Sequence, residues 1–392
     1  MDVLFKPYWI LNANHHLYFN IGNNFEKSSL STIEAQSMSD GKINDFAPGG
    51  FGNDIDYRLN DAIAGIEYKF RLGKWTNRPA LFLHRYDLRT RQPGDLNSVS
   101  FNVLQPRIIS EYDFNNSENL YFSYELGNAF AGIEKFAGRF TLLDYNLVFR
   151  GNPNLSNERF HSGVLRYTKF SSFRGIQLNA GISLLKKEKS IQNVVALDGI
   201  NQFSTVFLTN NPETTWRINF GFSKKVQKLN FRLNVLTNWF SYVQNLNGVA
   251  ARYDRNSQNI RITAKTAHKS LPDVSLTYGK SFSRFDGPST ARFTSDAIDA
   301  YCSVPFFRNW VAAADFSYLR NKNASGSKND FLTTSASLRY QKKDSPFIFE
   351  CSAQNIFNNR HKNMYSFSDY VVSEQNIKVL PRAALLSIMY KL

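Results

Sequence analysis

The chain has 392 residues, a formal net charge of +15 and 15% aromatic residues, yet its mean hydropathy is −0.38. It contains no run of about 18 apolar residues, which excludes a membrane-spanning helix. A nucleic-acid binder gathers its basic residues on one face or arm, whereas here they recur along the whole length. We therefore expect no nucleic-acid partner.

The amino-terminal residues 1–7 have no basic leader and too short an apolar run for a signal peptide. Residues 3–10 have the pattern of the end of a strand, and Leu17, Phe19 and Ile21 predict the next strand. We expect a chain that has lost its signal peptide or that begins within a longer protein.

Alternation with a period of two dominates the sequence. In residues 214–240 a polar turn separates two alternating runs. Successive side chains leave a strand on opposite faces, so this pattern predicts a hairpin. Its apolar face carries Trp216, Ile218, Phe220, Phe222, Phe231, Leu233 and Val235. That face can pack on a second sheet in a soluble sandwich or face lipid in a transmembrane barrel.

The same pattern extends along the whole chain. Other strands are expected at residues 64–70, 80–88, 99–114, 120–126, 165–167, 176–182, 260–266, 274–278, 285–291, 298–304, 310–318, 332–340, 347–351 and 386–392. Connections are expected to alternate short and long, as they do between the tight periplasmic turns and long extracellular loops of outer-membrane barrels. We count roughly 16–17 strands, within the usual range for such barrels.

Charged residues fall mainly in the polar register of these strands. This set comprises Glu67, Glu125, Arg166, Arg217, Arg232, Arg261, Lys265, Asp315, Arg339, Glu350 and Lys391. A Lys or Arg on a lipid face near the bilayer midplane costs about 2–4 kcal/mol, so a bilayer would impose this sorting. The apolar register holds His84, Lys280 and Asp296 as exceptions, and Cys302 and Cys351 as expected free, lipid-side thiols.

The fold class predicted from these patterns is all-β. We expect a transmembrane antiparallel up-and-down β-barrel over residues 1–392, located in the outer membrane. A soluble sandwich could also bury the apolar face. That alternative gives no reason for the alternation of loop lengths along the chain.

Three segments resemble TonB-dependent outer-membrane receptors, especially the Bacteroidetes-type barrel family. The first is the Tyr-rich strand 120–124 followed by Gly-Asn-Pro-Asn-Leu-Ser-Asn-Glu at 151–158. The second is Ala-Gln-Asn-Ile-Phe-Asn-Asn at 353–359, and the third is Leu-Pro-Arg at 380–382 before the final strand. The chain departs from the family at Leu392, where an aromatic residue is usual.

The resemblance implies the carboxy-terminal portion of a larger receptor barrel, without the amino-terminal plug and first strands. In the family, extracellular loops capture a scarce solute, and energy relayed through TonB moves the plug. The implied solute is a glycan, a ferric chelate or a peptide. The implied partners are outer-membrane lipid and lipopolysaccharide, the TonB complex through the missing plug region, and a surface lipoprotein. The alternatives are a passive porin or surface adhesin barrel, and a secreted soluble β-protein that binds glycans.

No catalytic, cofactor-binding or metal site is expected. The acidic segments 40–45 and 53–56 offer oxygen ligands but lack the spacing of a calcium loop. Neighbouring His161 and Ser162 point to opposite faces of a strand and cannot share a proton. As candidate lumen residues for an anionic solute we name Arg217, Arg232, Arg261 and Arg339. Arginines of this kind can also pair with lumen acids such as Glu350.

Overall fold

The computed structural model of the chain describes residues 2–267, 271–323, 326, 328–343, 345–367 and 372–391. It comprises two compact units. Unit 1 is Met1–Arg166, Ile182–Trp216 and Phe240–Tyr253, and unit 2 is Tyr167–Gly181, Arg217–Trp239 and Asp254–Leu392. Over these described residues, twenty-one strands belong to one sheet. Among the described residues, no helix is long and apolar enough to cross a membrane.

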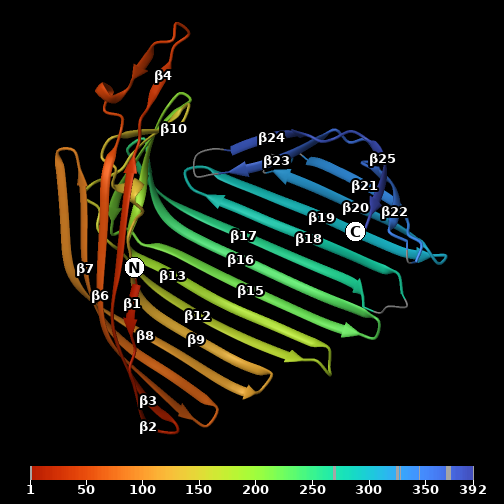
Figure 1. Cartoon of the computed structure of the whole chain (residues 1–392), viewed down its shortest axis with the longest axis horizontal. Coiled ribbons are helices and arrows are strands. Elements are labelled where there is room, and N and C mark those ends of the chain that lie inside the picture. Colours follow the sequence, from red (N-terminus) through yellow and green to blue (C-terminus); the bar gives the residue numbers. More distant parts are fainter. Residues whose placement is uncertain are drawn as a thin grey trace. The chain divides into compact units, whose positions relative to one another are not determined.

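Unit 1 holds the first strands and their long connections (Figure 1). Its strands are β1 (Asp2–Phe5), β2 (Tyr8–Asn12), β3 (His15–Ser31), β4 (Ala35–Ser37), β5 (Ile43–Asp45), β6 (Asp54–Leu72), β7 (Trp75–Gln92), β8 (Asp95–Asn115), β9 (Glu118–Ala129), β10 (Phe140–Asp144), β11 (Leu147–Arg150) and β14 (Asn201–Thr209). Two short 3-10 helices, η1 (Ala47–Gly49) and η2 (Ile133–Phe136), lie in its connections.

Five strands contribute residues to both units: β12 (Glu158–Ser171), β13 (Ile176–Asp198), β15 (Glu213–Val226), β16 (Leu229–Leu246) and β17 (Val249–Thr266). Unit 2 also holds β18 (Asp273–Asp286), β19 (Thr290–Phe306), β20 (Trp310–Asn323), β21 (Lys328–Tyr340), β22 (Phe347–Gln354), β23 (His361–Phe367), β24 (Val372–Lys378) and β25 (Ala383–Tyr390).

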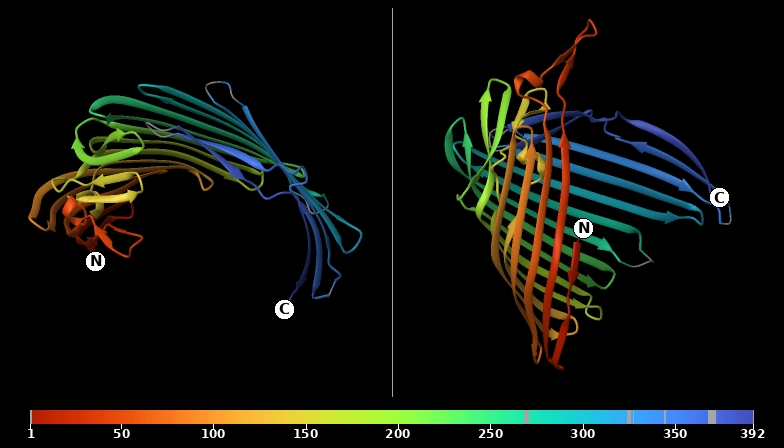
Figure 2. Two further views of the ribbon diagram at one scale, coloured as in Figure 1. Left: turned by 90° about the horizontal axis from the view of Figure 1, so that it is seen from above. Right: turned by 60° about the vertical axis from the view of Figure 1, so that its left-hand side comes forward.

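The predicted all-β, antiparallel, up-and-down organisation is confirmed. In unit 1, β3, β6, β7, β8 and β9 pair in that order, each antiparallel to the next (Figure 2). In unit 2, β17 to β22 and then β25 pair in the same manner. Over the described residues, sixteen strands follow this path, from β3 to β25, and β1 with β2 forms a further broken strand against β3. This count agrees with the sequence-based one.

The expected alternation of short and long connections is wrong at several places. The β7–β8 connection is only Pro93 and Gly94, and the β16–β17 connection is only Asn247 and Gly248. The strands of these hairpins have 18 residues, except β8, which has 21. These strands are longer than the about 9–11 residues that cross a membrane in known barrels. The polar segments that were expected to be loops instead continue the hydrogen-bonded pairing of the strands. The strand expected at 285–291 is likewise the tip of the β18–β19 hairpin.

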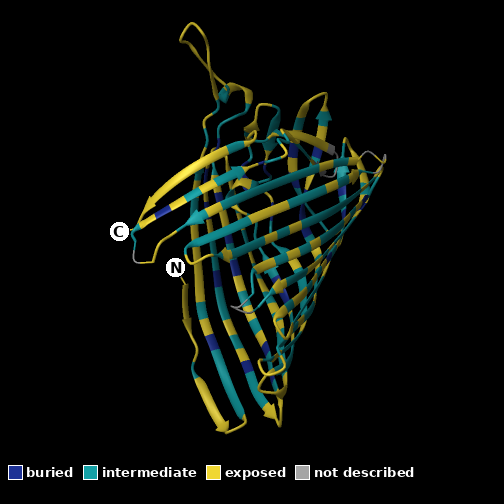
Figure 3. Cartoon of the chain, turned by 90° about the vertical axis from the view of Figure 1, so that its right-hand side faces the viewer, coloured by how far each residue is buried: buried dark blue, intermediate teal, exposed yellow. Residues whose placement is uncertain are grey.

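Alternating exposure along the strands follows the alternating sequence (Figure 3). In unit 1, Ile21, Ala64, Leu83 and Leu104 face one another across four strands. Of these, Ile21 is 61% and Leu104 54% exposed. The apolar row therefore lies on an uncovered face of the sheet.

His84 lies on the opposite face, which corrects its assignment to the apolar register. Exposed Leu81 and Leu83 carry the apolar face of β7, while Tyr86 and Leu88 are buried on the same side as His84. Both faces of this strand are rich in apolar side chains. Alternation alone therefore could not identify its outer face.

Large apolar residues on the inner side of unit 1 form a core. Phe136 in η2 and Leu155 are fully buried, together with Tyr57 and Ile55 of β6 and Leu88 of β7. The rings of Tyr57 and Phe136 are 5.5 Å apart, within the range of favourable aromatic pairs. The connection between β9 and β12 thus folds back against the strands.

Replacing Phe136 with Ala should lower the free energy of unfolding by about 3–5 kcal/mol, because a fully buried ring leaves a cavity. Urea unfolding in detergent, followed by tryptophan fluorescence, measures the change. Phe173→Ala provides the control, because Phe173 is 100% exposed in the β12–β13 turn. Equal unfolding midpoints for the two variants would contradict the packing described here.

Candidate functional site

A cavity of about 430 Å³ lies on the inner face of unit 1. Its charged and polar lining comes from Lys6, Asn20, His84, Gln105, Arg107, Glu125 and Asn128. Phe82 and Phe160 add aromatic surface. Polar groups converging beside aromatic rings are the usual composition of a small-molecule site.

Glu67 organises the positive charges of this cavity. Its Oε2 lies 2.9 Å from the Nη2 of Arg107, and its Oε1 lies 3.4 Å from the Nζ of Lys6. The Glu67 side chain is only 7% exposed, whereas those of Lys6 and Arg107 are 38% and 36% exposed. The carboxylate therefore fixes two cations that remain accessible from the cavity.

The small side chain of Ala80 permits this pairing. Ala80 lies directly between Glu67 of β6 and Arg107 of β8 in the cross-strand register. The next residue in the row is Glu125 of β9, opposite Arg107. The guanidinium of Arg107 also lies 4.8 Å from the ring centre of Phe82, at cation–π distance. A larger residue at 80 would block the reach of Glu67 to Arg107.

A second polar network lies deeper in the same face. The Nδ1 of His84 is 2.8 Å from Oδ1 of Asp61 and 3.2 Å from the hydroxyl of Tyr86, which accepts a hydrogen bond from Nε2 of Gln105 at 2.9 Å. A carboxylate accepts only, so Nδ1 of His84 carries the donated proton. His84 and Gln105 of this network both line the cavity.

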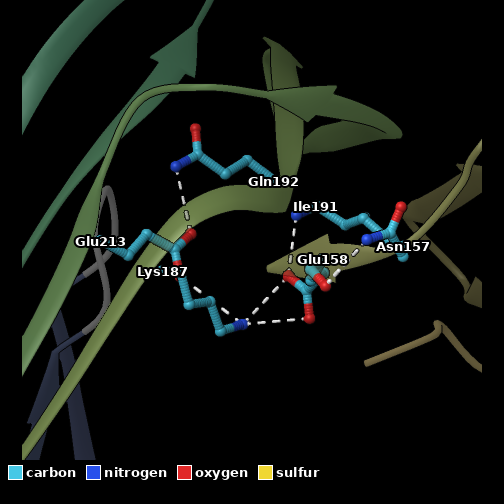
Figure 4. Close-up of polar contacts among 6 residues, drawn as sticks. All are labelled: Asn157, Glu158, Lys187, Ile191, Gln192 and Glu213. Atoms are coloured by element: carbon cyan, nitrogen blue, oxygen red, sulfur yellow. Dashed lines mark hydrogen bonds and ion pairs between the residues drawn. The ribbon is translucent and has the colours of Figure 1, made fainter. Parts of the chain in front are cut away.

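The loop before β12 is anchored beside the cavity (Figure 4). Glu158 receives two contacts from Nζ of Lys187, at 3.0 and 3.2 Å, and its Oε1 accepts a hydrogen bond from the backbone N–H of Ile191 at 2.8 Å. Lys187 also lies 3.7 Å from Glu213, which accepts a hydrogen bond from Gln192. Asn157 donates to Asn128, a residue of the cavity wall.

The Gly-Asn-Pro-Asn-Leu segment has a physical explanation in this geometry. A Cβ at Gly151 would lie 2.5 Å from the backbone oxygen of Lys135, so only glycine fits. Leu155 enters the core, and Glu158 holds the start of β12. The segment therefore has a structural role next to the cavity.

The Asn-Ile-Phe-Asn segment closes a turn in unit 2. Nδ2 of Asn355 donates to the backbone oxygens of Asn359 and Leu380, both at 2.8 Å, and its Oδ1 accepts from the Asn359 N–H. Asn358 accepts from the N–H of Arg382. The second and third motifs therefore meet in one hydrogen-bonded turn. Leu392 lies outside the described residues.

The outer face of unit 2 carries an apolar band with defined edges. Its upper edge is a row of four charges, Lys280, Asp296, Arg320 and Asp330, which lie directly opposite one another on β18 to β21. Its lower edge is the aromatic row of Phe306, Trp310 and Tyr340. Between them lie Val274, Leu276, Tyr278, Ile298, Ala300, Cys302, Val304, Ala312, Ala314, Phe316, Tyr318, Leu332, Thr334, Ala336 and Leu338.

The height of this band follows from strand geometry. Ten residues separate Asp296 from Phe306 along β19, which is about 34 Å at 3.4 Å per residue. A strand tilt of about 45° reduces this to a height of about 24 Å, close to the ~25 Å apolar band of outer-membrane barrels. Lys280 and Asp296, the predicted exceptions, form an ion pair at 2.9 Å on its upper edge.

The two cysteines lie where the register predicts. Cys302 is opposite Val274 and Ala314, and Cys351 is opposite Leu338. Both are free thiols on the apolar face, Cys302 half-buried and Cys351 exposed.

The four arginines named from the sequence are on strands of unit 2. Arg217, Arg232 and Arg261 are exposed, and Arg339 is half-buried. Nε of Arg217 donates to Asn238 at 2.9 Å, and Arg339 lies opposite Glu350 in the cross-strand register. The cavity of unit 1 uses other residues, so a solute role for these arginines stays a prediction.

Sequence reasoning placed Glu67 and Glu125 on the polar face but missed Lys6 and Arg107. Lys6 lies between β1 and β2, and Arg107 follows Pro106, which disturbs the alternation.

The acidic segment 40–45 forms hydrogen bonds within its own loop. Asp40 accepts a hydrogen bond from the backbone N–H of Lys42, which lowers the pKa of its carboxyl below the ordinary value.

The chain matches no protein-family model, and a sequence comparison with curated proteins finds no match. Its structure is similar to the copper transporter OprC, with 11% identity over 99% of this chain and 71% of that chain, at a TM-score of 0.43. It is also similar to OmpT, an outer membrane protein of Vibrio cholerae, with 10% identity over 97% and 98% of the two chains, at 0.33. The ferric enterobactin receptor PfeA from Pseudomonas aeruginosa gives 9% identity over 92% and 64%, at 0.35. Similarities with TM-scores this low support no conclusion of their own.

Glu67→Ala should destabilise the protein by about 1–3 kcal/mol, because it leaves Arg107 and Lys6 without their shared carboxylate in a partly desolvated site. The free energy of unfolding in detergent measures the loss. Lys42→Ala is the control, since it removes an ion pair with Asp40 whose side chains are 83% and 52% exposed, and it should cost under about 1 kcal/mol. Equal losses would show that Glu67 does not organise the cavity.

Proposed function

We propose that this chain is the β-barrel portion of an outer-membrane receptor that takes up a scarce solute. The observation that best supports this proposal is the exposed apolar band of unit 2. By strand geometry it is about 24 Å high, and it lies between a charged row and an aromatic row. In a soluble sandwich the same Leu, Ile and Phe side chains would face a second sheet. Among the described residues, Leu276 is 51%, Ile262 49% and Ile388 63% exposed.

The cavity of unit 1 supports a binding role. It combines fixed cations, a carboxylate, a histidine nitrogen and two aromatic faces. Such a lining suits a polar solute with oxygen-rich or anionic groups, of which a glycan, a ferric chelate and a peptide are the candidate classes. We propose a binding and transport role for these residues, without catalysis.

TonB dependence and the partners rest on the sequence resemblance. The three motifs occur in the family order, and their residues anchor connections beside the cavity and before β25. We propose that the complete receptor engages the TonB complex through a plug, with a surface lipoprotein as a further partner. A passive porin is the alternative outcome of the transport experiment below.

The lipid orientation of the band can be tested by Leu276→Arg. In a bilayer this change should lower folding stability by about 2–4 kcal/mol, because Leu276 lies near the middle of the band. Thr277→Arg introduces the same side chain on the other face of the same strand and should cost far less. Urea titration in lipid vesicles provides both values. If Leu276→Arg is tolerated and the protein is soluble without detergent, the membrane proposal fails.

Transport can be tested in a Gram-negative host that produces the complete receptor, with and without a working TonB. Uptake of maltoheptaose, ferric citrate and trialanine serves as the probe. Uptake of one class that disappears without TonB, and drops about tenfold in Arg107→Gln, is the expected result. TonB-independent entry of all three would indicate a passive porin. Lys42→Gln controls for the change in charge.

A further inference from the structure

We propose that unit 2 binds a small organic anion in a cavity between the β23–β24 hairpin and the sheet. The cavity has a volume of about 280 Å³ and is lined by residues of β18, β19, β20 and β23. Its charge comes from Lys322 and Lys362, and its neutral polar groups include Ser281, Ser283, Ser295 and Asn321. This site is separate from the cavity of unit 1, and the inference does not depend on a transport role.

The serines of this cavity lie on the face opposite to the apolar band. Ser281 is five residues from Leu276 on β18, and Ser295 is three residues from Ile298 on β19. An odd separation places two side chains on opposite sides of a strand. Ser281 lies directly opposite Ser295, which in turn lies directly opposite Asn321 of β20. Three neighbouring strands therefore present adjoining hydrogen-bonding groups on the inner side of the sheet.

The hairpin that completes the cavity is anchored to the sheet. The turn formed by Asn355 precedes β23, and in this turn Nδ2 of Asn359 donates to the backbone oxygen of Leu332 on β21. Nζ of Lys362 on β23 lies 5.5 Å from the ring centre of Phe331 on β21, at cation–π distance. The turn and this contact together hold Lys362 at the cavity.

The lining offers hydrogen-bond donors and positive charge. A lysine ammonium only donates, and a serine hydroxyl can donate one hydrogen bond. The hydroxyl of Ser281 already accepts a hydrogen bond from Nδ2 of Asn259 at 2.7 Å, which leaves its own hydrogen available to a ligand. No residue of the lining carries a carboxylate. The matching ligand group is therefore an acceptor with negative charge.

The two lysines of the lining lack a counter-charge. Among the described residues, neither Lys322 nor Lys362 has a carboxylate within ion-pair distance. Elsewhere in this unit Arg320, on the same strand as Lys322, pairs with Asp330 at 2.8 Å. Lys362 is half-buried, and a partly desolvated cation without a partner is unfavourable. A bound anion would supply the missing charge.

Apolar side chains complete the lining and indicate that the anion is organic. They are Phe293 of β19, Leu319 of β20 and Met364 of β23. A carbon skeleton gains free energy by covering such surface, whereas an inorganic ion does not. The cavity lies just below the range of about 300–1,000 Å³ that is usual for drug-sized ligands. We therefore infer a compact ligand, in which a carboxylate or phosphate group is attached to a skeleton the size of one sugar.

The test is calorimetric titration of glucuronate into the full chain folded in detergent, with glucose as the uncharged counterpart. The unaltered protein should bind glucuronate at least about tenfold more tightly than glucose, and K362Q should weaken glucuronate binding by about tenfold, because both changes remove a charge-assisted hydrogen bond. K362R keeps the charge and should bind within about threefold of the unaltered protein.

The matched control for K362Q is K378Q. Lys378 is exposed on β24 of the same hairpin and does not line the cavity. The substitution makes the same change in net charge, and it should alter binding by less than about twofold because solvent and salt screen an exposed charge. Equal affinities of K362Q and K378Q for glucuronate would overturn the proposal.

A second variant, S281A/S295A, tests the hydroxyls without a change in charge. It should weaken glucuronate binding about fivefold, because two neutral hydrogen bonds are lost. The control S275A/S303A removes two serines from the same strands that do not line the cavity and should leave binding unchanged. Heat-modifiable migration in gels shows that each variant has folded. Equal binding by the two double variants would contradict a role of these hydroxyls.

Competition experiments identify the ligand group. Glucose 6-phosphate carries a phosphate on the same skeleton and should displace glucuronate. Inorganic phosphate lacks the skeleton and should compete at least about tenfold more weakly, because it covers no apolar surface. The number of sites from calorimetry separates this cavity from that of unit 1. Glucose binding as tight as glucuronate, or inorganic phosphate competing as strongly as glucose 6-phosphate, would overturn the assignment of an organic anion.

Discussion

The exposed apolar face is the constraint from which the other features of this protein follow. Large aliphatic and aromatic side chains alternate with polar ones along strands of 8 to 23 residues. Monomeric soluble proteins rarely expose contiguous apolar patches larger than a few hundred Å², so a face of this kind calls for an apolar neighbour. The charges mark where that face must end. In unit 2 they form a complete row across four strands, and in unit 1 they begin at Arg85.

The opposite face is free to be polar, and it is used for packing and binding. The connection between β9 and β12 returns to this side and buries Phe136 and Leu155. Glu158 then fixes the start of β12 through Lys187 and the Ile191 backbone. The cavity beside it depends on the same anchoring, because Asn128 belongs to its wall and bonds to Asn157. Loop packing and site geometry are therefore coupled in unit 1.

Alternation predicted the faces of β18 to β21 because apolar side chains predominate on one side of these strands. Leu276, Ile298 and Phe316 identify the outer side without ambiguity. The same reasoning failed for His84, since β7 has Leu81 and Leu83 outside and Tyr86 and Leu88 inside. The inner rings pack on a connection distant in sequence, and no local pattern reports that contact. The prediction of long loops between β7 and β8 and between β16 and β17 was wrong for a related reason. The polar ends of these strands have the amino-acid composition of loops.

Only part of the site could be predicted from the sequence. Alternation within one strand shows which face a residue occupies, but it does not show which residue of the neighbouring strand lies opposite. Glu67 could be assigned to the polar face, but its meeting with Arg107 depends on Ala80 lying between them. The same limit applies to the charges on the outer face. Lys280, Asp296, Arg320 and Asp330 alternate in sign across the sheet, so each neutralises its neighbours at the edge of the apolar band. Lys27, Arg58 and Arg89 of unit 1, in contrast, have one sign and lie directly opposite one another. The alternation within each strand assigns these residues to a face, but only the cross-strand register shows which of them neutralise one another.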